Sequence, residues 1–134
     1  MNTPEGSLTP AQFEILQLLW QSPDGLTIAE LWDAIRTDRD VSRTTVLNLV
    51  DRLEKRNWLS REKHEGVFRY RVVVDQQVTE AKLADTFVSE FFNGSTSSFV
   101  LSLLGSNRIS SADLKRLKAL LEESQSKRSQ RKGS

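Results

Sequence analysis

The sequence predicts a mainly α-helical protein with a small β-hairpin, and three observations lead to this fold class. Apolar residues recur at the three- and four-residue spacing of α-helices from Thr9 to about residue 56. The spacing then shortens to the alternation of β-strands on either side of Glu65–Gly66. Helical spacing returns from Asp75 onward. With 134 residues, of which 37% are hydrophobic, the chain has enough apolar material for one domain, or for one compact domain with an appendage.

The first two helices are marked by their capping residues. Thr9 is a natural N-cap, and Pro10 occupies the first helical position, where its missing N–H is harmless. The turn residues of Ser22–Gly25 end this helix, and Thr27 caps the next one. The apolar face of the second helix is formed by Ile28, Leu31, Trp32 and Ile35.

A third helix is expected over about residues 42–56, with Ser42 as its N-cap. One side is an apolar stripe, formed by Val46, Leu49, Val50 and Leu53. The other side mixes arginines with short hydrogen-bonding side chains, unlike the Glu/Lys pairs of an ordinary solvated helix. We expect Asp51 on this side either to lie outside the surface that meets a partner or to pair with Lys55, four residues further on.

A β-hairpin is expected within about residues 58–74, because two strand-like runs flank the turn at Glu65–Gly66. Three helices followed by a hairpin are the plan of a winged helix-turn-helix DNA-binding domain, here over residues 1–74. In that plan the third helix normally enters the major groove of DNA, and the hairpin, or wing, reaches the flanking backbone.

Positive charge is concentrated on the same segment. The net charge is −5 over residues 1–38, +4 over residues 39–71 and +2 over residues 72–134. A local basic patch is the electrostatic footprint of a nucleic-acid binder, and Arg, Asn and Thr side chains can read guanine, adenine and thymine. The candidate DNA-binding residues are Arg43, Thr44, Thr45, Asn48 and Arg52 on the third helix, and Lys63, His64 and Arg69 on the wing.

Several of these residues have alternative roles. Thr44 and Thr45 could cap the helix instead, and Arg52 could form a salt bridge with a neighbouring acid. Leu47 could contact a thymine methyl group or complete the edge of the core. Four aromatic residues are expected in the core rather than in a chemical role: Trp20, Trp32, Trp58 and Tyr70.

Residues 75–123 are expected to form a helical dimerisation region, and residues 124–134 a disordered basic tail. The Phe- and Leu-rich helices of this region could cover the domain itself. We favour burial between two copies, because a two-fold dimer suits the reading of two DNA half-sites. The candidate dimerisation residues are Leu83, Phe87, Val88, Phe91, Phe92, Phe99, Leu103, Leu114, Leu117 and Leu121.

Composition argues against several other classes of protein. The chain has no cysteine and one histidine, His64, which leaves no plausible nucleophile–base pair, metal site or cofactor site. It has no apolar run of membrane-spanning length and no signal pattern, so we expect a cytoplasmic protein without a membrane partner. The alternative function is a winged-helix protein–protein interaction module, which would be expected to lack the basic face of residues 39–71.

The ordered array of these segments resembles the bacterial penicillinase-repressor family (BlaI/MecI/CopY) over about residues 7–123. The resemblance rests on LTPAQFEILQLLW (8–20), SRTTVLNLVDRLEKRNWL (42–59) and GVFRYRVVV (66–74). It implies a dimeric winged-helix transcriptional repressor that binds a palindromic operator, with the third helix in the major groove and the C-terminal helices forming the dimer.

Two features of the family do not transfer to this chain. Penicillin-responsive members are inactivated by proteolysis at an Asn–Phe bond, and Ser102–Leu103 occupies the place of that bond here. Copper-responsive members carry a C-terminal Cys-x-Cys pair, whereas this chain has no cysteine. The sequence therefore names neither the inducing signal nor an upstream sensor or protease.

Overall fold

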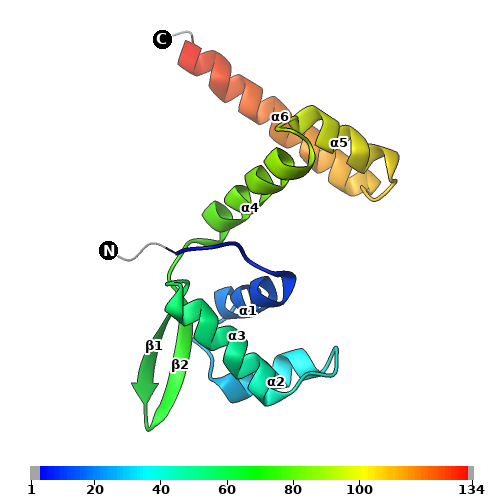
Figure 1. The fold of residues 1–134 in the computed structure, drawn as a ribbon. Coiled ribbons are helices and arrows are strands. Elements are labelled where there is room, and N and C mark those ends of the chain that lie inside the picture. Colours follow the sequence, from blue (N-terminus) through cyan, green and yellow to red (C-terminus); the bar gives the residue numbers. More distant parts are fainter. Residues whose placement is uncertain (1–3, 133–134) are drawn as a thin grey trace. The chain divides into compact units, whose positions relative to one another are not determined.

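The computed structural model describes residues 4–132, which form six helices and one two-stranded antiparallel sheet (Figure 1). The chain divides into two compact units, of which the first ends at Ala81 and the second begins at Lys82. The elements are α1 (Pro10–Trp20), α2 (Ile28–Arg36), α3 (Arg43–Lys55), β1 (Leu59–His64), β2 (Val67–Val72), α4 (Gln76–Phe91), α5 (Thr96–Gly105) and α6 (Ser111–Lys132).

The helices of the first unit begin at side chains that satisfy free backbone N–H groups. The Thr9 hydroxyl accepts from the Gln12 N–H, and the Gln12 side chain accepts from the Thr9 N–H, which makes a capping box. Thr27 and Glu30 form a second capping box at α2. The expected N-caps, Thr9, Thr27 and Ser42, are therefore all confirmed.

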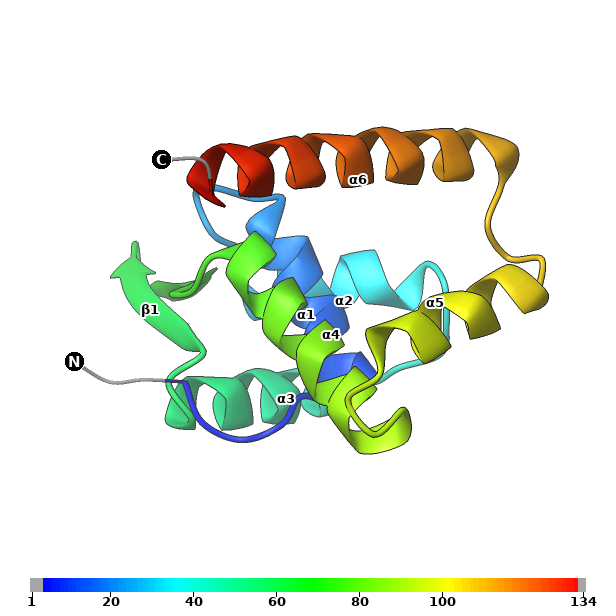
Figure 2. The same cartoon turned by 90° about the horizontal axis from the view of Figure 1, so that it is seen from above.

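In the first unit, α3 packs against α1, α2 and β1, and α1 packs against β2 (Figures 1 and 2). Val46, Val50 and Leu53 of α3 are fully buried, and Leu49 is half-buried, which confirms the predicted stripe. The buried core is made of Ile15, Leu16, Leu19, Leu31, Ile35, Val46, Val50, Leu53, Leu59 and Tyr70.

The three tryptophans lie at the edge of this core rather than inside it, whereas Tyr70 is buried as expected. An indole ring presents a polar N–H that needs a partner when it is covered. Each indole N–H donates to a backbone carbonyl oxygen: Trp20 to Val74 at 3.0 Å, Trp32 to Val41 at 2.8 Å and Trp58 to Glu5 at 2.9 Å.

The expected hairpin is present, with Leu59 opposite Val72 at its base and His64 opposite Val67 at its tip. A short extra pairing joins it to the segment before α2. Leu26 forms an isolated antiparallel bridge with Tyr70, in which the Tyr70 N–H donates to the Leu26 carbonyl oxygen at 2.8 Å. A one-residue bridge has no repeating pattern, so the sequence did not predict it.

The second unit contains a cluster of phenylalanine rings that joins α4 to α5. Ring centroids lie 4.8 Å apart for Phe87 and Phe91, 5.8 Å for Phe87 and Phe99, and 5.3 Å for Phe92 and Phe99. Aromatic pairs at such separations stabilise beyond the area they bury. Among the residues described, no helix is long and apolar enough to cross a membrane.

The expectation of a disordered tail over residues 124–134 is wrong for the part that the structure describes, because α6 continues to Lys132. The segment lacks apolar residues, which suggested disorder, but before Gly133 it also lacks glycine and proline. Its Gln, Lys and Arg residues are good helix formers, and extending an existing helix avoids the cost of nucleation. Residues 133–134 lie outside the described part.

Candidate nucleic-acid interface

The first two turns of α3 expose the predicted base-reading side chains. Arg43, Thr44 and Asn48 are exposed, whereas the stripe on the opposite side of the helix is buried in the core. Rotation of α3 about its axis would bring that stripe into water, so the packing fixes which residues face outward. Leu47 belongs to the same outward face, with 46% of its surface exposed, rather than to the core edge.

Thr45 differs from its neighbours because its side chain takes part in the helix cap. Its hydroxyl lies 2.8 Å from the Ser42 hydroxyl, and its backbone N–H donates to that same oxygen at 3.1 Å. In the free protein, Thr45 therefore takes part in the helix cap, which was the alternative role considered for it. Thr44 and Asn48 remain the neutral polar side chains at the start of α3 that are available to a partner.

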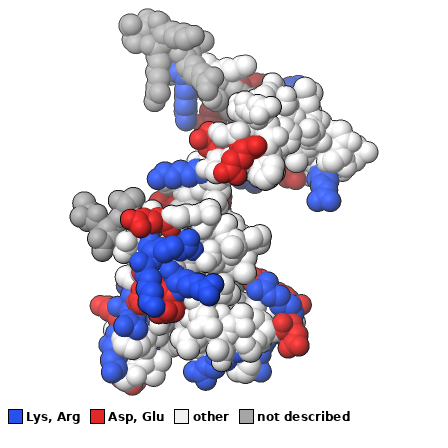
Figure 3. Space-filling model, in the orientation of Figure 1, with Lys and Arg blue, Asp and Glu red and all other residues white. Residues whose placement is uncertain are grey.

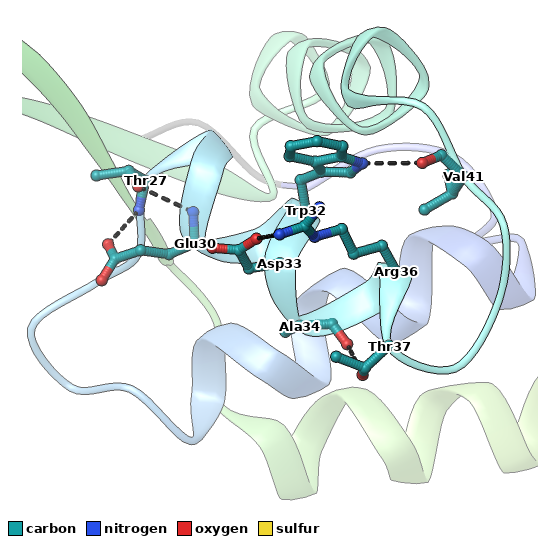
Figure 4. A network of polar contacts seen from close by, with 8 residues as sticks. All are labelled: Thr27, Glu30, Trp32, Asp33, Ala34, Arg36, Thr37 and Val41. Atoms are coloured by element: carbon teal, nitrogen blue, oxygen red, sulfur yellow. Dashed lines mark hydrogen bonds and ion pairs between the residues drawn. The ribbon is translucent and has the colours of Figure 1, made fainter.

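The turn before α3 is held by the side chain of Trp32, as Figure 4 shows. Its indole N–H donates to the carbonyl oxygen of Val41, one residue before the N-cap. The Arg36 guanidinium lies over the indole ring, 4.4 Å from its centroid, and also pairs with Asp33. The sequence suggested only a core role for Trp32, and this hydrogen bond ties α2 to the start of α3.

The cationic side chains of α3 fall into two groups. Lys55 pairs with Asp51 at 2.9 Å, as predicted from their spacing. Arg43 and Arg52 are exposed and form no salt bridge within residues 4–132. Lys and Arg gather with interspersed acidic residues on the face that carries α3 and the hairpin (Figure 3).

Strand alternation separates the predicted wing residues onto two faces of the hairpin. Lys63 shares a face with the buried Leu59 and Tyr70, which is the face that packs toward α3. His64 and Arg69 lie on the opposite face. The structure therefore does not bring the three predicted wing residues together.

Phe68 is a platform for two cations on the α3 side of the hairpin. The Arg61 guanidinium lies 4.1 Å from the centroid of the Phe68 ring, and the Lys63 ammonium lies 5.7 Å from it. Arg61 also pairs with Glu54 of α3 at 3.1 Å. The sequence did not single out Arg61 or Phe68, although their alternation with Lys63 and Tyr70 could have placed them on one face.

On the opposite face, His64 and Arg69 both have acidic partners. The His64 ring lies 3.3 Å from the Glu62 carboxylate. Arg69 is half-buried, and its Nη1 lies 3.1 Å from the Gly25 carbonyl oxygen and 3.4 Å from Glu30 Oε1. Its guanidinium is therefore engaged inside the domain.

The Glu30 carboxylate takes part in the capping box at the start of α2. A hydrogen bond from the Thr27 backbone N–H keeps the pKa of Glu30 below its ordinary value, and the nearby Arg69 charge acts in the same direction. A pocket on the hairpin is lined by Ser60, Glu62, Arg69 and Arg71, which share one face of the strands, and by Arg61 from the opposite face. Within the described residues, no group of three or more acidic or histidine side chains could hold a metal ion.

The predicted dimerisation residues of the second unit differ in exposure. Five of them are half-buried or buried within the chain: Leu83, Phe92, Phe99 and Leu103 are half-buried, and Val88 is buried. Others remain open to solvent, as do four large apolar residues that were not predicted. The exposed group comprises Phe87, Phe91, Val100, Leu101, Leu104, Leu114, Leu117, Leu120 and Leu121.

A sequence model of the penicillinase repressor family matches residues 8–123. The chain belongs to this family. It is similar to the methicillin resistance regulatory protein MecI of Mammaliicoccus sciuri, with 22% identity over 123 residues that cover 92% of this chain and 99% of MecI. The penicillinase repressor of Bacillus licheniformis is 24% identical over 116 residues, which cover 87% of this chain and 90% of that protein.

Solved structures support the winged-helix fold of this penicillinase repressor family member. A MarR family protein from Bacillus stearothermophilus matches with a TM-score of 0.51 and 21% identity, covering 92% of this chain and 77% of its own. MepR, a transcription regulator of the Staphylococcus aureus multidrug efflux pump MepA, matches with a TM-score of 0.50 and 23% identity, covering 90% and 80%. The family and its relatives are transcriptional regulators rather than enzymes.

Proposed function

We propose that this penicillinase repressor family member represses transcription by binding a palindromic DNA operator as a homodimer. The observation that carries the proposal is the outward face of α3, where Arg43, Thr44 and Asn48 are exposed on the side away from the apolar stripe that packs into the core. An α-helix fits the major groove, where each base pair presents a distinct pattern of donors and acceptors. We assign α3 to that groove.

Two kinds of contact with DNA are distinguished among the exposed residues of α3 and the hairpin. Arg43 and Asn48 are assigned to base edges, because Arg pairs with guanine and Asn with adenine through two hydrogen bonds each. Arg52 and Lys63 are assigned to phosphates, because they are exposed and without an acidic partner in residues 4–132. Phosphate contacts fix the position of a protein on DNA, whereas base contacts read its sequence.

The dimer is assigned to the second unit. Leu114, Leu117 and Leu121 recur at helical spacing on α6 and are 43–64% exposed. Apolar faces of this kind on a soluble protein mark interaction sites. A second copy of the chain is the partner we propose, because an isologous two-fold dimer presents two α3 helices to the two halves of a palindrome.

Selection of duplexes from a random-sequence pool by the full-length protein tests the function. We expect the selected sequences to be palindromic and to bind at least about 10³-fold more tightly than a scrambled duplex of the same composition. Lys115→Ala on α6 removes one exposed charge that lies away from the leucine face and far along the chain from α3, and it is the control. Equal affinity for selected and scrambled duplexes would contradict the proposal and favour the protein–protein interaction module.

A further inference from the structure

The Arg69 side chain joins three segments of the first unit. It extends from β2 to the Gly25 carbonyl oxygen, at 3.1 Å, and to the Glu30 carboxylate of α2, at 3.4 Å. Its neighbour Tyr70 is bonded through its backbone to Leu26. Arg69 therefore lies at the joint where the wing meets the start of α2.

The acidic partner of Arg69 is itself held in place. Glu30 Oε1 accepts from the Thr27 N–H at 3.0 Å, and the Glu30 N–H donates to the Thr27 hydroxyl at 3.1 Å (Figure 4). This capping box fixes the carboxylate against the first turn of α2. A cation on the wing that pairs with a fixed carboxylate ties the position of the wing to the position of the helix-turn-helix.

We infer that Arg69 and Glu30 are a positioning pair, which sets the wing for DNA binding without contacting DNA. The inference rests on the proposed function and replaces the assignment of Arg69 to phosphate contact. The DNA contact made by the wing is then that of Lys63, on the opposite face of the hairpin. Arg69 affects DNA affinity only indirectly, because it sets the position of the wing that carries Lys63.

The pairing predicts that Glu30→Gln changes DNA affinity in the direction opposite to the one that simple electrostatics predicts. Glu30 is a negative charge in a domain that binds a polyanion, so its removal would by simple electrostatics strengthen DNA binding. If Glu30 positions the wing, its removal weakens binding instead. The two explanations therefore give opposite results for Glu30→Gln.

The test uses the full-length protein, the duplex it selects from a random pool and a scrambled duplex, each at several salt concentrations. Glu30→Gln keeps the capping box, because glutamine serves equally at that position, and removes only the charge. We expect Glu30→Gln and Arg69→Gln each to weaken binding about threefold to tenfold, as an exposed salt bridge and one hydrogen bond would. Both should lower the salt dependence alike, and the double variant should bind no more weakly than either single variant.

Three results would overturn the inference. Unchanged or tighter binding by Glu30→Gln would show that the pair does not position the wing. A salt slope lowered by about one unit in Arg69→Gln alone would show that Arg69 contacts phosphate directly. Faster amide exchange at Tyr70 with unchanged DNA binding would reduce the pair to a structural role. Failure of the wild-type protein to prefer the selected duplex would instead contradict the proposed function itself.

Discussion

Arg43 and Asn48 are exposed within the first two turns of α3, and their side chains match the edges of guanine and adenine. We expect Arg43→Ala or Asn48→Ala to cost about 1–3 kcal/mol of binding to the selected duplex and to relax preference at one base pair. Binding to a scrambled duplex should change little for Asn48→Ala. Titration of each variant with both duplexes gives the ratio of affinity for the selected duplex to affinity for the scrambled duplex, which should fall. An unchanged ratio would show that these residues do not contact bases.

Arg52 and Lys63 should behave differently, because phosphates are the same in every sequence. Arg52→Ala and Lys63→Ala are expected to weaken binding to selected and scrambled duplexes alike. Each should lower the slope of log affinity against log salt by about one unit, since one fewer phosphate is neutralised. Lys55→Ala is the matched control on α3, because Lys55 is already paired with Asp51. A loss confined to the selected duplex would contradict the assignment.

Trp32→Phe tests the hydrogen bond that holds the turn before α3. The substitution keeps an aromatic ring beside Arg36 but leaves the Val41 carbonyl oxygen without its donor. We expect the free energy of unfolding to fall by about 1 kcal/mol, measured by chemical denaturation. Trp58→Phe is the control, because its indole N–H donates to Glu5 in an exposed setting and should matter less. Equal losses in both variants would contradict the special role of Trp32.

The sequence predicted the roles of individual residues where those roles depend on partners three or four positions away in the chain. The caps at Thr9, Thr27 and Ser42 and the pair Asp51–Lys55 follow from spacings of three and four residues. The sequence could not predict the pairing of Arg69 with Glu30 and Gly25, because these residues lie 39 and 44 positions apart and meet only through tertiary packing.

Among the elements, the hairpin depends on a glycine that approaches another backbone closely. Gly25 has a φ of 80°, and a Cβ placed there would lie 2.8 Å from the Tyr70 carbonyl oxygen. Gly66, in the turn of the hairpin, has a φ of 83° but no atom within 4 Å of such a Cβ. Gly25→Ala therefore adds a steric clash to a conformational cost of about 1 kcal/mol that the two positions share.

Chemical denaturation of the two variants separates these effects. Gly66→Ala should lose about 1 kcal/mol of unfolding free energy, and Gly25→Ala should lose clearly more. Gly25→Ala should also speed amide exchange at Tyr70, whose N–H bonds to Leu26. Equal losses in the two variants would mean that the close approach at Gly25 relaxes without cost.

The sequence predicted the elements themselves well, since apolar period and capping residues agree for α1, α2 and α3 and the alternation marks the hairpin. Prediction from the sequence failed where it relied on apolar spacing alone. The absence of apolar residues after Glu123 suggested disorder, but the end of α6 is helical because helix extension needs no buried face. The bridge between Leu26 and Tyr70 could not be predicted, because a pairing of one residue produces no repeating pattern in the sequence.

For the whole molecule, we expect a dimer whose interface lies in the second unit. Sedimentation at micromolar concentration should give the mass of two chains, and Leu121→Glu should shift it toward one, because a buried charge is costly. Lys115→Glu on the same helix, on the side away from Leu114, Leu117 and Leu121, is the control for charge alone. A wild-type chain that sediments as a monomer would contradict the dimer.

A truncated chain completes the test. The boundary between the compact units lies after Ala81, and Thr79 is only 4% exposed, so residues up to Ala81 should be kept. This fragment is expected to fold as a monomer, measured by circular dichroism and sedimentation. A fragment that still dimerises would place the interface in the first unit.

The two capping boxes of the first unit respond differently to acid. At α1 the reciprocal bond comes from Gln12, which carries no titratable proton, whereas at α2 it comes from Glu30. The pKa of Glu30 is lowered in the folded protein, so its stabilising effect is complete above the ordinary glutamate value of about 4.3 and is lost as the pH falls below it. Mild acid should therefore loosen the start of α2 and its tie to the wing while the start of α1 stays intact. At low pH the wild-type and Glu30→Gln proteins would then become alike in their tie between α2 and the wing.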